Sequence, residues 1–336
     1  MSYKKLGFLC LCTILLLIGC KQSKEKRIVT ENVIHDSYAL VKDWPNLPED
    51  YIVGMPTGLA INSKGNIVVF NRTRPWSFPP PEEKIKNNII ITIDNETGKI
   101  LKSWGTDLFL MPHGLEIDWD NNIWVTDVGL QQVLKFNSDG ELLNMLGEET
   151  ILGYDSIHFA LPTDVAVNPE GSFYVSDGYR NSRVVKYDKD NSYLFEWGKN
   201  GPDYKLNKGD KEGEFNTPHG IDLDKNMNVY VADRENNRIQ KFNSEGKFLA
   251  VWQNKSAHQL YSVAVDHKNN YLLAIDYDSI AKTSKILRFD LDLNLDMQFN
   301  NPNTRYHDIA IDDEGTIFVG DIAGHKIQKF LLVKGE

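Results

Sequence analysis

Short runs of alternating apolar and polar residues, separated by turn-forming residues, recur along most of the chain. One stretch shows the pattern in full, with four such runs at 220–223, 229–233, 238–242 and 248–252. Asn, Asp and Gly are frequent in the segments between these runs. Alternation with a period of two and turns at this spacing predict four short antiparallel strands joined by hairpins.

The same unit recurs six times along the chain. Each copy opens a strand-like run with His, Thr or Ser, and an Asp or Asn follows 14 residues later. The six pairs are Thr57 and Asn71, His113 and Asp127, Thr163 and Asp177, His219 and Asp233, Ser262 and Asp276, and His307 and Asp321. A fixed internal period indicates repeats, and six units of four strands predict an all-β, six-bladed β-propeller.

The last unit ends before its fourth strand. It contains runs for three strands, at 308–312, 316–320 and 325–332, and the sequence then stops. The stretch 37–44 matches the fourth-strand pattern of other units, such as 100–104. We therefore predict that an N-terminal strand completes the last blade, which closes the ring and removes an open sheet edge.

The N-terminal residues 1–19 are expected to be a secretion signal. Lysines precede an apolar run at 6–18, which is too short to span a membrane. This run ends in Leu-Ile-Gly-Cys, which resembles the lipobox of bacterial lipoproteins and implies that Cys20 carries a lipid. Residues 20–34, rich in Lys and Glu, are expected to be a flexible tether before a propeller domain at 35–336.

Composition limits the class of partner. The chain has 336 residues, 41% of them hydrophobic, and can bury a substantial core in one domain. Its formal net charge of -10 argues against nucleic-acid binding, which needs clustered Lys and Arg. Once the signal is removed, no cysteine remains for a disulfide. We expect an exported monomer, on the periplasmic or cell-surface side, that touches a bacterial cell membrane only through its lipid.

Histidine opens every second unit, at His113, His219 and His307. The innermost strand of each propeller blade lines the central channel, so alternate blades are related by a pseudo-threefold rotation. The three imidazoles should therefore converge on the axis. Three nitrogen ligands with an open fourth position are typical of catalytic Zn²⁺. A histidine at this position can alternatively form only hydrogen bonds in the channel.

Residues that follow the second strand should lie on the same face as the histidines. They include Arg72, Tyr179 and Arg234. The three longest segments outside the predicted strands also lie there, at 72–90, 148–161 and 199–217. Long loops in a compact fold are frequently functional. Beside a metal, a phenol with a lowered pKa can act as a base, and a guanidinium can hold a substrate carboxylate.

Two levels of resemblance follow from these motifs. The run 231–242 resembles the NHL family of propeller repeats. Longer phrases resemble the peptidyl-α-hydroxyglycine α-amidating lyase family over about residues 56–330. The phrases lie at 70–72, 111–115, 124–128, 158–159, 162–167, 175–183, 218–219 and 232–236. The Ser-Asp-Gly-Tyr sequence at 176–179 is much more specific than the general repeat.

The lyase resemblance implies two metal sites. It implies a zinc ion held by the three histidines His113, His219 and His307. It also matches Asp308 to a ligand of a structural calcium ion, helped by the backbone carbonyls of Leu59 and Leu115.

The resemblance also implies the residues that act on a substrate. Tyr179 matches the catalytic base, Arg72 lies beside the reacting group, and Arg234 matches a site-lining arginine. We count Arg72, Arg234 and Arg305 as substrate-binding residues. The chain departs from the family at Arg305 and Tyr306, where the family has Met-Pro before its third histidine and the Met lines the site. The family's disulfides are also absent.

The expected reaction is cleavage of a peptidyl- or N-acyl-α-hydroxyglycine to a primary amide and glyoxylate. Zinc would lower the pKa of the substrate hydroxyl, and Tyr179 would remove its proton. A non-catalytic NHL propeller that binds a peptide or glycan at the cell envelope is the alternative. A calcium-dependent lactonase would need several carboxylates at the channel centre, whereas the ring positions are His, Thr and Ser. Fold alone does not separate these functions.

Overall fold

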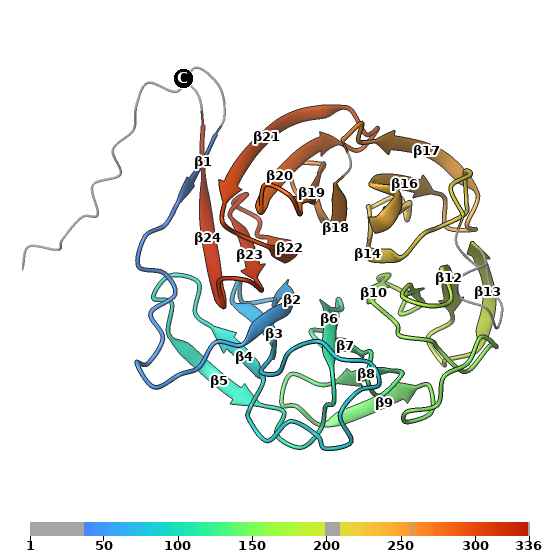
Figure 1. Ribbon diagram of the computed structural model, residues 1–336, viewed down its shortest axis with the longest axis horizontal. Helices are drawn as coiled ribbons and strands as arrows, with labels where there is room; N and C mark the ends of the chain where they lie inside the picture. Colours follow the sequence, from blue (N-terminus) through green and yellow to red (C-terminus); the bar gives the residue numbers. More distant parts are fainter. Residues whose placement is uncertain (1–36, 199–208, 257, 335–336) are drawn as a thin grey trace, which may run out of the picture.

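The computed structural model describes residues 37–198, 209–256 and 258–334. Six antiparallel sheets of four strands each surround a central channel, as Figure 1 shows. The predicted six-bladed β-propeller is therefore confirmed. The predicted signal peptide, the tether and Cys20 lie outside the described residues. The described residues form no apolar helix of membrane-spanning length.

Each blade runs outward from the channel in chain order. The first blade contains β2 (Met55–Ile61), β3 (Ile67–Arg72), β4 (Ile90–Ile93) and β5 (Ile100–Trp104). The second contains β6 (Pro112–Ile117), β7 (Ile123–Asp127), β8 (Gln132–Phe136) and β9 (Leu142–Leu146). The third contains β10 (Asp164–Val167), β11 (Phe173–Asp177), β12 (Arg183–Tyr187) and β13 (Tyr193–Gly198).

The remaining blades follow the same order. The fourth contains β14 (Pro218–Leu223), β15 (Val229–Asp233), β16 (Arg238–Phe242) and β17 (Phe248–Gln253), with a short 3-10 turn η1 (Arg234–Asn236) after β15. The fifth contains β18 (Gln259–Asp266), β19 (Tyr271–Asp278), β20 (Thr283–Asp290) and β21 (Leu295–Pro302). The sixth contains β22 (Tyr306–Ile311), β23 (Ile317–Asp321) and β24 (Lys326–Val333).

The N-terminal strand closes the ring as predicted. β1 (Ser37–Leu40) pairs antiparallel with β24, with Ser37 opposite Val333 and Leu40 opposite Phe330. The sixth sheet thus has the order β1, β24, β23, β22, and β1 lies outermost (Figure 1). The edge of β24 is thereby paired within the chain rather than left open.

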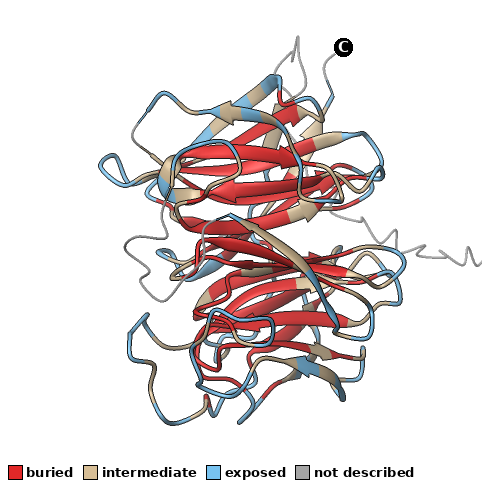
Figure 2. Cartoon of the chain, turned by 90° about the vertical axis from the view of Figure 1, so that its right-hand side faces the viewer, coloured by how far each residue is buried: buried red, intermediate tan, exposed pale blue. Residues whose placement is uncertain are grey.

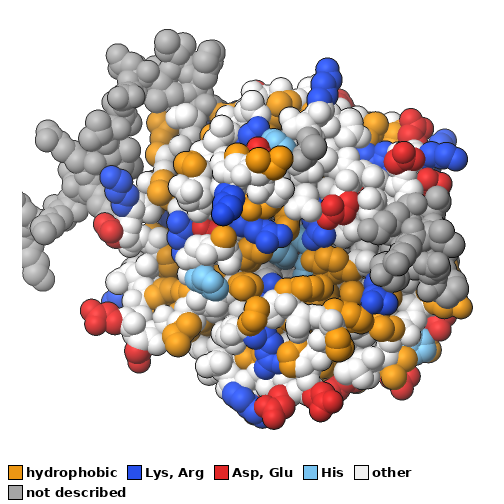
Figure 3. Space-filling view, viewed as in Figure 1, with side chains coloured by type: hydrophobic (Ala, Val, Ile, Leu, Met, Phe, Trp, Pro, Cys, Tyr) orange, Lys and Arg blue, Asp and Glu red, His pale blue; other side chains and the backbone are white. Residues whose placement is uncertain are grey.

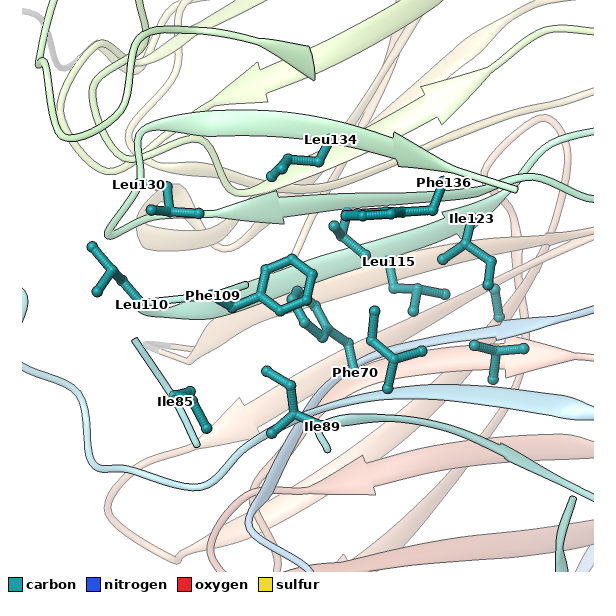
Figure 4. Close-up of a cluster of buried hydrophobic side chains, with 14 residues drawn as sticks. Phe70, Ile85, Ile89, Phe109, Leu110, Leu115, Ile123, Leu130, Leu134 and Phe136 are labelled. Carbon is teal, nitrogen blue, oxygen red and sulfur yellow. The ribbon is translucent and has the colours of Figure 1, made fainter. Parts of the chain in front are cut away.

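The hydrophobic core lies between neighbouring blades. Figure 4 shows one such cluster, in which Phe70 of the first blade meets Phe109 and Phe136 near the second. The Phe70 and Phe109 ring centroids are 4.8 Å apart and nearly perpendicular, a favourable edge-to-face arrangement. Figure 2 shows that buried residues fill the strands while exposed residues lie in the loops and outer edges. This rigid packing holds the inner strands around the channel.

Candidate functional site

Each of the three histidines lies on the innermost strand of its blade. His113 is on β6, His219 on β14 and His307 on β22. The pairing of each of these strands with the next is irregular at the histidine, where a β-bulge interrupts the register. Bulges redirect side chains, and such irregularities are frequent beside active sites. The repeat sequence therefore places a histidine at the point where the strand departs from regular pairing.

The structure brings the three imidazoles together on the channel axis. The ring centroid of His113 lies 4.7 Å from that of His219 and 4.7 Å from that of His307. The centroids of His219 and His307 are 4.9 Å apart. One nitrogen of each ring lies within 4.8 Å of the others. All three side chains are buried. A single ion could contact all three.

Backbone carbonyls fix the orientation of each ring. Every Nδ1 lies within 2.8 Å of a backbone carbonyl oxygen in the neighbouring blade. Each of these carbonyls belongs to the innermost strand of that blade or directly precedes it. The pairs are His113 with Thr163, His219 with Tyr261, and His307 with Thr57. A carbonyl only accepts, so each Nδ1 carries the proton and each Nε2 presents a lone pair. This is the protonation state that a metal ligand requires.

Burial keeps these rings neutral. It lowers the pKa of His113 to about 3, with a further contribution from the nearby Arg72 guanidinium. The pKa values of His219 and His307 are also lowered, first by burial and then by neighbouring cationic groups. The Tyr179 hydroxyl contacts two of the three inward lone pairs, with its oxygen 2.9 Å from Nε2 of His113 and 3.2 Å from Nε2 of His219. One O–H cannot satisfy three acceptors, whereas a cation can.

The recurrent aspartate at the end of the second strand positions the histidine strands. Its carboxylate accepts hydrogen bonds from the backbone just before the first strand. Three such contacts precede the histidines: Leu110 N to Asp127 (2.8 Å), Asn216 N to Asp233 (2.7 Å) and Arg305 N to Asp321 (2.9 Å). The 14-residue spacing therefore reflects a structural contact rather than a second set of reacting groups.

We expect Asp127→Asn to destabilise the fold. Asp127 is fully buried and accepts hydrogen bonds from four backbone N–H groups, some of which an amide would leave unsatisfied. The free energy of unfolding should fall by about 1–3 kcal/mol, measured by urea denaturation. Asp139→Asn is the control, because the Asp139 side chain is 84% exposed and its replacement should change the value by less than about 0.5 kcal/mol. Equal effects of the two substitutions would contradict the positioning role.

Tyr179 follows β11 and reaches the histidines from the third blade. The preceding Gly178 passes so close to β14 that a Cβ atom there would lie 1.9 Å from the carbonyl oxygen of Pro218. Only glycine permits this approach, which explains why a glycine precedes Tyr179. The ring of Tyr179 packs against that of Trp76 from the loop between β3 and β4, at 4.8 Å.

Two opposing effects act on the pKa of Tyr179. Burial raises the pKa of its phenol, and the guanidiniums of Arg234 and Arg72 oppose this rise. Nη1 of Arg234 donates to the phenol oxygen at 3.3 Å. Without a metal, the protein groups alone therefore leave Tyr179 protonated at neutral pH. The lowered pKa expected from the sequence requires a cation in the site.

Arg72 is buried beside the histidines at the end of β3. Nη1 donates to the carbonyl of Pro112 at 3.4 Å, and Nη2 contacts the sulfur of Met55 at the same distance. Its Nε is buried without a hydrogen-bond partner. A buried donor without a partner is costly, and a bound anion would satisfy it.

Two further arginines approach from other blades. The Arg234 guanidinium lies between the rings of Tyr179 and Tyr261, with its central carbon 5.1 and 5.3 Å from their centroids. Arg305 donates from Nε to the hydroxyl of Tyr261 at 3.1 Å. The structure thus brings all four sequence-predicted substrate-site residues to one face. The sequence analysis missed Tyr261 and Trp76. Tyr261 precedes the ring residue Ser262, at the position that is proline in four of the six units, and this departure from the repeat was the available signal. Trp76 lies in a loop outside the repeat pattern.

Carboxylates line the channel on the other side of the histidines. Glu116, Asp164, Asp222 and Asp308 border a cavity of about 800 Å³ that also contacts Leu59 and Leu115. Burial raises the pKa of Asp308 to about 6, although Ser262 and the backbone N–H of Leu59 donate to its oxygens. Burial and mutual repulsion raise the pKa of Glu116 and Asp164 as well.

This donor set fits a hard cation such as Ca²⁺, which prefers oxygen ligands. Leu59 approaches Asp308 through its N–H, so the structure does not itself show the expected carbonyl contact. The sequence analysis considered only the His, Thr and Ser positions that open each repeat, and it did not identify Glu116, Asp164 and Asp222. They belong to the opposite side of the channel from Tyr179 and the arginines, and several are tied to backbone N–H groups of the next blade.

Sequence comparison places these features among known proteins. The NHL repeat family matches residues 109–136, 159–187 and 215–242. The chain is 34% identical over 321 residues to peptidyl-glycine alpha-amidating monooxygenase B of Xenopus laevis, a match that covers 88% of this chain and 35% of that protein. It is 33% identical over 303 residues to a probable peptidyl-alpha-hydroxyglycine alpha-amidating lyase of Caenorhabditis elegans, covering 84% of this chain and 83% of that protein.

The chain spans about a third of the length of the amidating monooxygenases that it matches. Among solved structures, it is similar to virginiamycin B lyase from Staphylococcus aureus with quinupristin, with a TM-score of 0.58 and 13% identity over 89% of this chain and 100% of that chain. A streptogramin B lyase structure gives a TM-score of 0.55 and 16% identity over 90% of this chain and 100% of that chain. At such identities these structures support the propeller fold alone.

Proposed function

Because this chain belongs to the peptidyl-α-hydroxyglycine α-amidating lyase family, we propose that it cleaves the C–N bond of a peptidyl- or N-acyl-α-hydroxyglycine, releasing a primary amide and glyoxylate. The observation that carries the proposal is the convergence of three neutral, buried histidines beside Tyr179 and Arg72. The names of the relatives support a lyase, and no observation favours the non-catalytic alternative.

We assign Zn²⁺ to His113, His219 and His307, since their three Nε2 lone pairs are the donor set of a catalytic zinc site. When bound, zinc supplies Lewis-acid assistance that lowers the pKa of the substrate hydroxyl. A structural Ca²⁺ is proposed at Asp308, with Leu59 and Leu115, where buried carboxylates repel one another.

In the proposed reaction, Tyr179, Arg234 and Arg72 have separate roles. Tyr179, as the phenolate, removes the proton of the α-hydroxyl, and Arg234 stabilises its negative charge through the contact between Nη1 and the phenol oxygen. Arg72 holds the glycine carboxylate with its unpartnered Nε. As the C–N bond breaks, the electrons of the O–H bond form the aldehyde of glyoxylate. The proton passes from Tyr179 to the amide nitrogen, so none is gained or lost overall.

The proposal is tested by incubating purified protein with N-benzoyl-α-hydroxyglycine. We expect benzamide and glyoxylate in equal amounts, loss of turnover after chelation, and recovery with zinc. Elemental analysis of the same sample should find zinc, and calcium if the second site is filled. Absence of glyoxylate from a zinc-loaded sample would overturn the proposed reaction.

The proposed location rests on the N-terminal sequence, which lies outside the described residues. We propose that Cys20 carries a lipid that anchors the protein to a bacterial cell membrane, on the periplasmic or cell-surface side. Cys20→Ser should move the protein from the membrane fraction to the soluble fraction on centrifugation. Retention of the variant in the membrane fraction would contradict lipid anchoring.

A further inference from the structure

Three arginines converge on the site in a protein whose net charge is -10. Arg72 enters from the first blade, Arg234 from the fourth and Arg305 from the start of the sixth. In Figure 3, Lys and Arg side chains gather around the hollow at the centre of this face, where histidine is visible. This local charge is opposite to that of the whole chain.

Only one of the three arginines has a carboxylate partner among the described residues. Arg234 pairs with Glu235 at 2.8 Å. Arg72 contacts a carbonyl and a thioether, and its Nε has no partner. The side chain of Arg305 donates only to the hydroxyl of Tyr261. Two guanidiniums therefore face the site without a neutralising charge.

The Arg305 guanidinium is held in a fixed orientation. Its Nε and Nη2 both donate to the Tyr261 hydroxyl, at 3.1 and 2.5 Å. Its central carbon lies 5.5 and 5.3 Å from the ring centroids of Tyr261 and Tyr277. Its backbone N–H donates to Asp321. Such a pre-oriented fork loses little entropy when it binds an anion.

Tyr261 also sets the distance between Arg305 and the histidines. Its ring centroid lies 5.1 Å from that of His219 and 5.7 Å from that of His307. Arg305 thus stands one aromatic ring away from the proposed reaction centre. This position suits the acyl part of a substrate rather than the reacting carbon.

The charges of the expected substrate do not account for all three arginines. A hydroxyglycine has one carboxylate, which the free Nε of Arg72 can hold. Arg305 is half-buried, and no carboxylate among the described residues pairs with its guanidinium, which leaves it available to an anionic ligand.

We propose that Arg305, oriented by Tyr261, binds a second carboxylate carried by the acyl part of the substrate. The substrate class is therefore N-acyl-α-hydroxyglycines with an acidic acyl group. This inference rests on the proposed lyase function.

The test compares substrates that differ by one charge. N-Succinyl- and N-glutaryl-α-hydroxyglycine are assayed against their terminal amides, which have nearly the same shape. We expect the wild type to favour at least one acid over its amide by about tenfold to a hundredfold in kcat/KM, as for a hydrogen bond to a charged group. Arg305→Met should reduce that preference to near one, and Tyr261→Phe should reduce it in part. Arg74→Met is the control and should keep the preference, because Arg74 donates to the backbone carbonyl of Glu83 within its own loop.

A second readout separates this inference from the proposed reaction. Calorimetry with N-succinylglycine and N-glutarylglycine, which lack the hydroxyl and cannot react, gives the same comparison as a ratio of dissociation constants. If acid and amide are turned over and bound equally, or if Arg305→Met keeps the preference, the second-carboxylate site is wrong and the lyase function stands. If no substrate is cleaved but the acids bind preferentially through Arg305, the reaction is wrong and the anion site stands.

Discussion

Replacing His219 with alanine should remove the metal and reduce lyase turnover at least about 100-fold. Mutation of a residue that only orients a metal ligand already lowers metal affinity or activity about 10- to 100-fold, and loss of the ligand itself should cost more. His219 contributes one of three inward lone pairs, and two nitrogens cannot complete the site. Metal content by elemental analysis and glyoxylate release are the measurements. His219→Gln, which fills more of the buried space, distinguishes loss of the ligand from loss of the fold.

His158→Ala provides the matched control. His158 lies on the loop between the second and third blades and contacts Asp155 and Glu148. Its replacement should leave metal content and turnover as in the wild type. A His219→Ala protein that still binds one metal ion per chain at wild-type affinity would contradict the assigned ligand set.

Tyr179→Phe should keep the metal but lower kcat about 100- to 10,000-fold, the contribution expected of a general base. The substitution retains the ring that packs on Trp76 and removes only the hydroxyl that contacts His113 and His219. An unchanged rate would exclude Tyr179 as the base. Tyr193→Phe, on the outer strand β13 where the side chain is 40% exposed, is the control and should retain full activity.

The pH dependence provides an independent check on Tyr179. Burial raises the pKa of this phenol, while Arg234 and Arg72 oppose the rise. A bound cation would oppose it further. A base acts only when deprotonated, so kcat/KM should increase with pH until the pKa of Tyr179 is passed. This rising limb should be absent from the residual activity of Tyr179→Phe. Its persistence would assign the ionisation to another group.

Much of the fold could be predicted from the sequence because its determinants are local. The period-two runs predicted the strands of the fourth blade to within two residues at each end, and the missing last strand predicted the pairing of β1 with β24. Symmetry then predicted the convergence of the histidines. Equivalent positions in alternate blades are related by rotation about the channel axis, so the three side chains point toward the same place.

The parts that could not be predicted depend on contacts between distant residues. Tyr261 replaces the proline that precedes the ring residue in four of the six units, but its contact with Arg305 joins residues 44 apart in the chain and leaves no local signal. The aspartates at the 14-residue spacing were visible as a pattern. Their role was not, because their partners are backbone N–H groups with no sequence signal. Trp76 came near Tyr179 only through the path of a long loop.

The central claim is that three imidazoles from alternate blades hold one catalytic ion. X-ray absorption spectroscopy at the zinc edge of the purified, zinc-loaded protein measures this most directly. The account predicts one zinc per chain with three imidazole nitrogens at about 2.0–2.1 Å. Zinc surrounded only by oxygen ligands, or an unchanged spectrum in His219→Ala, would contradict it.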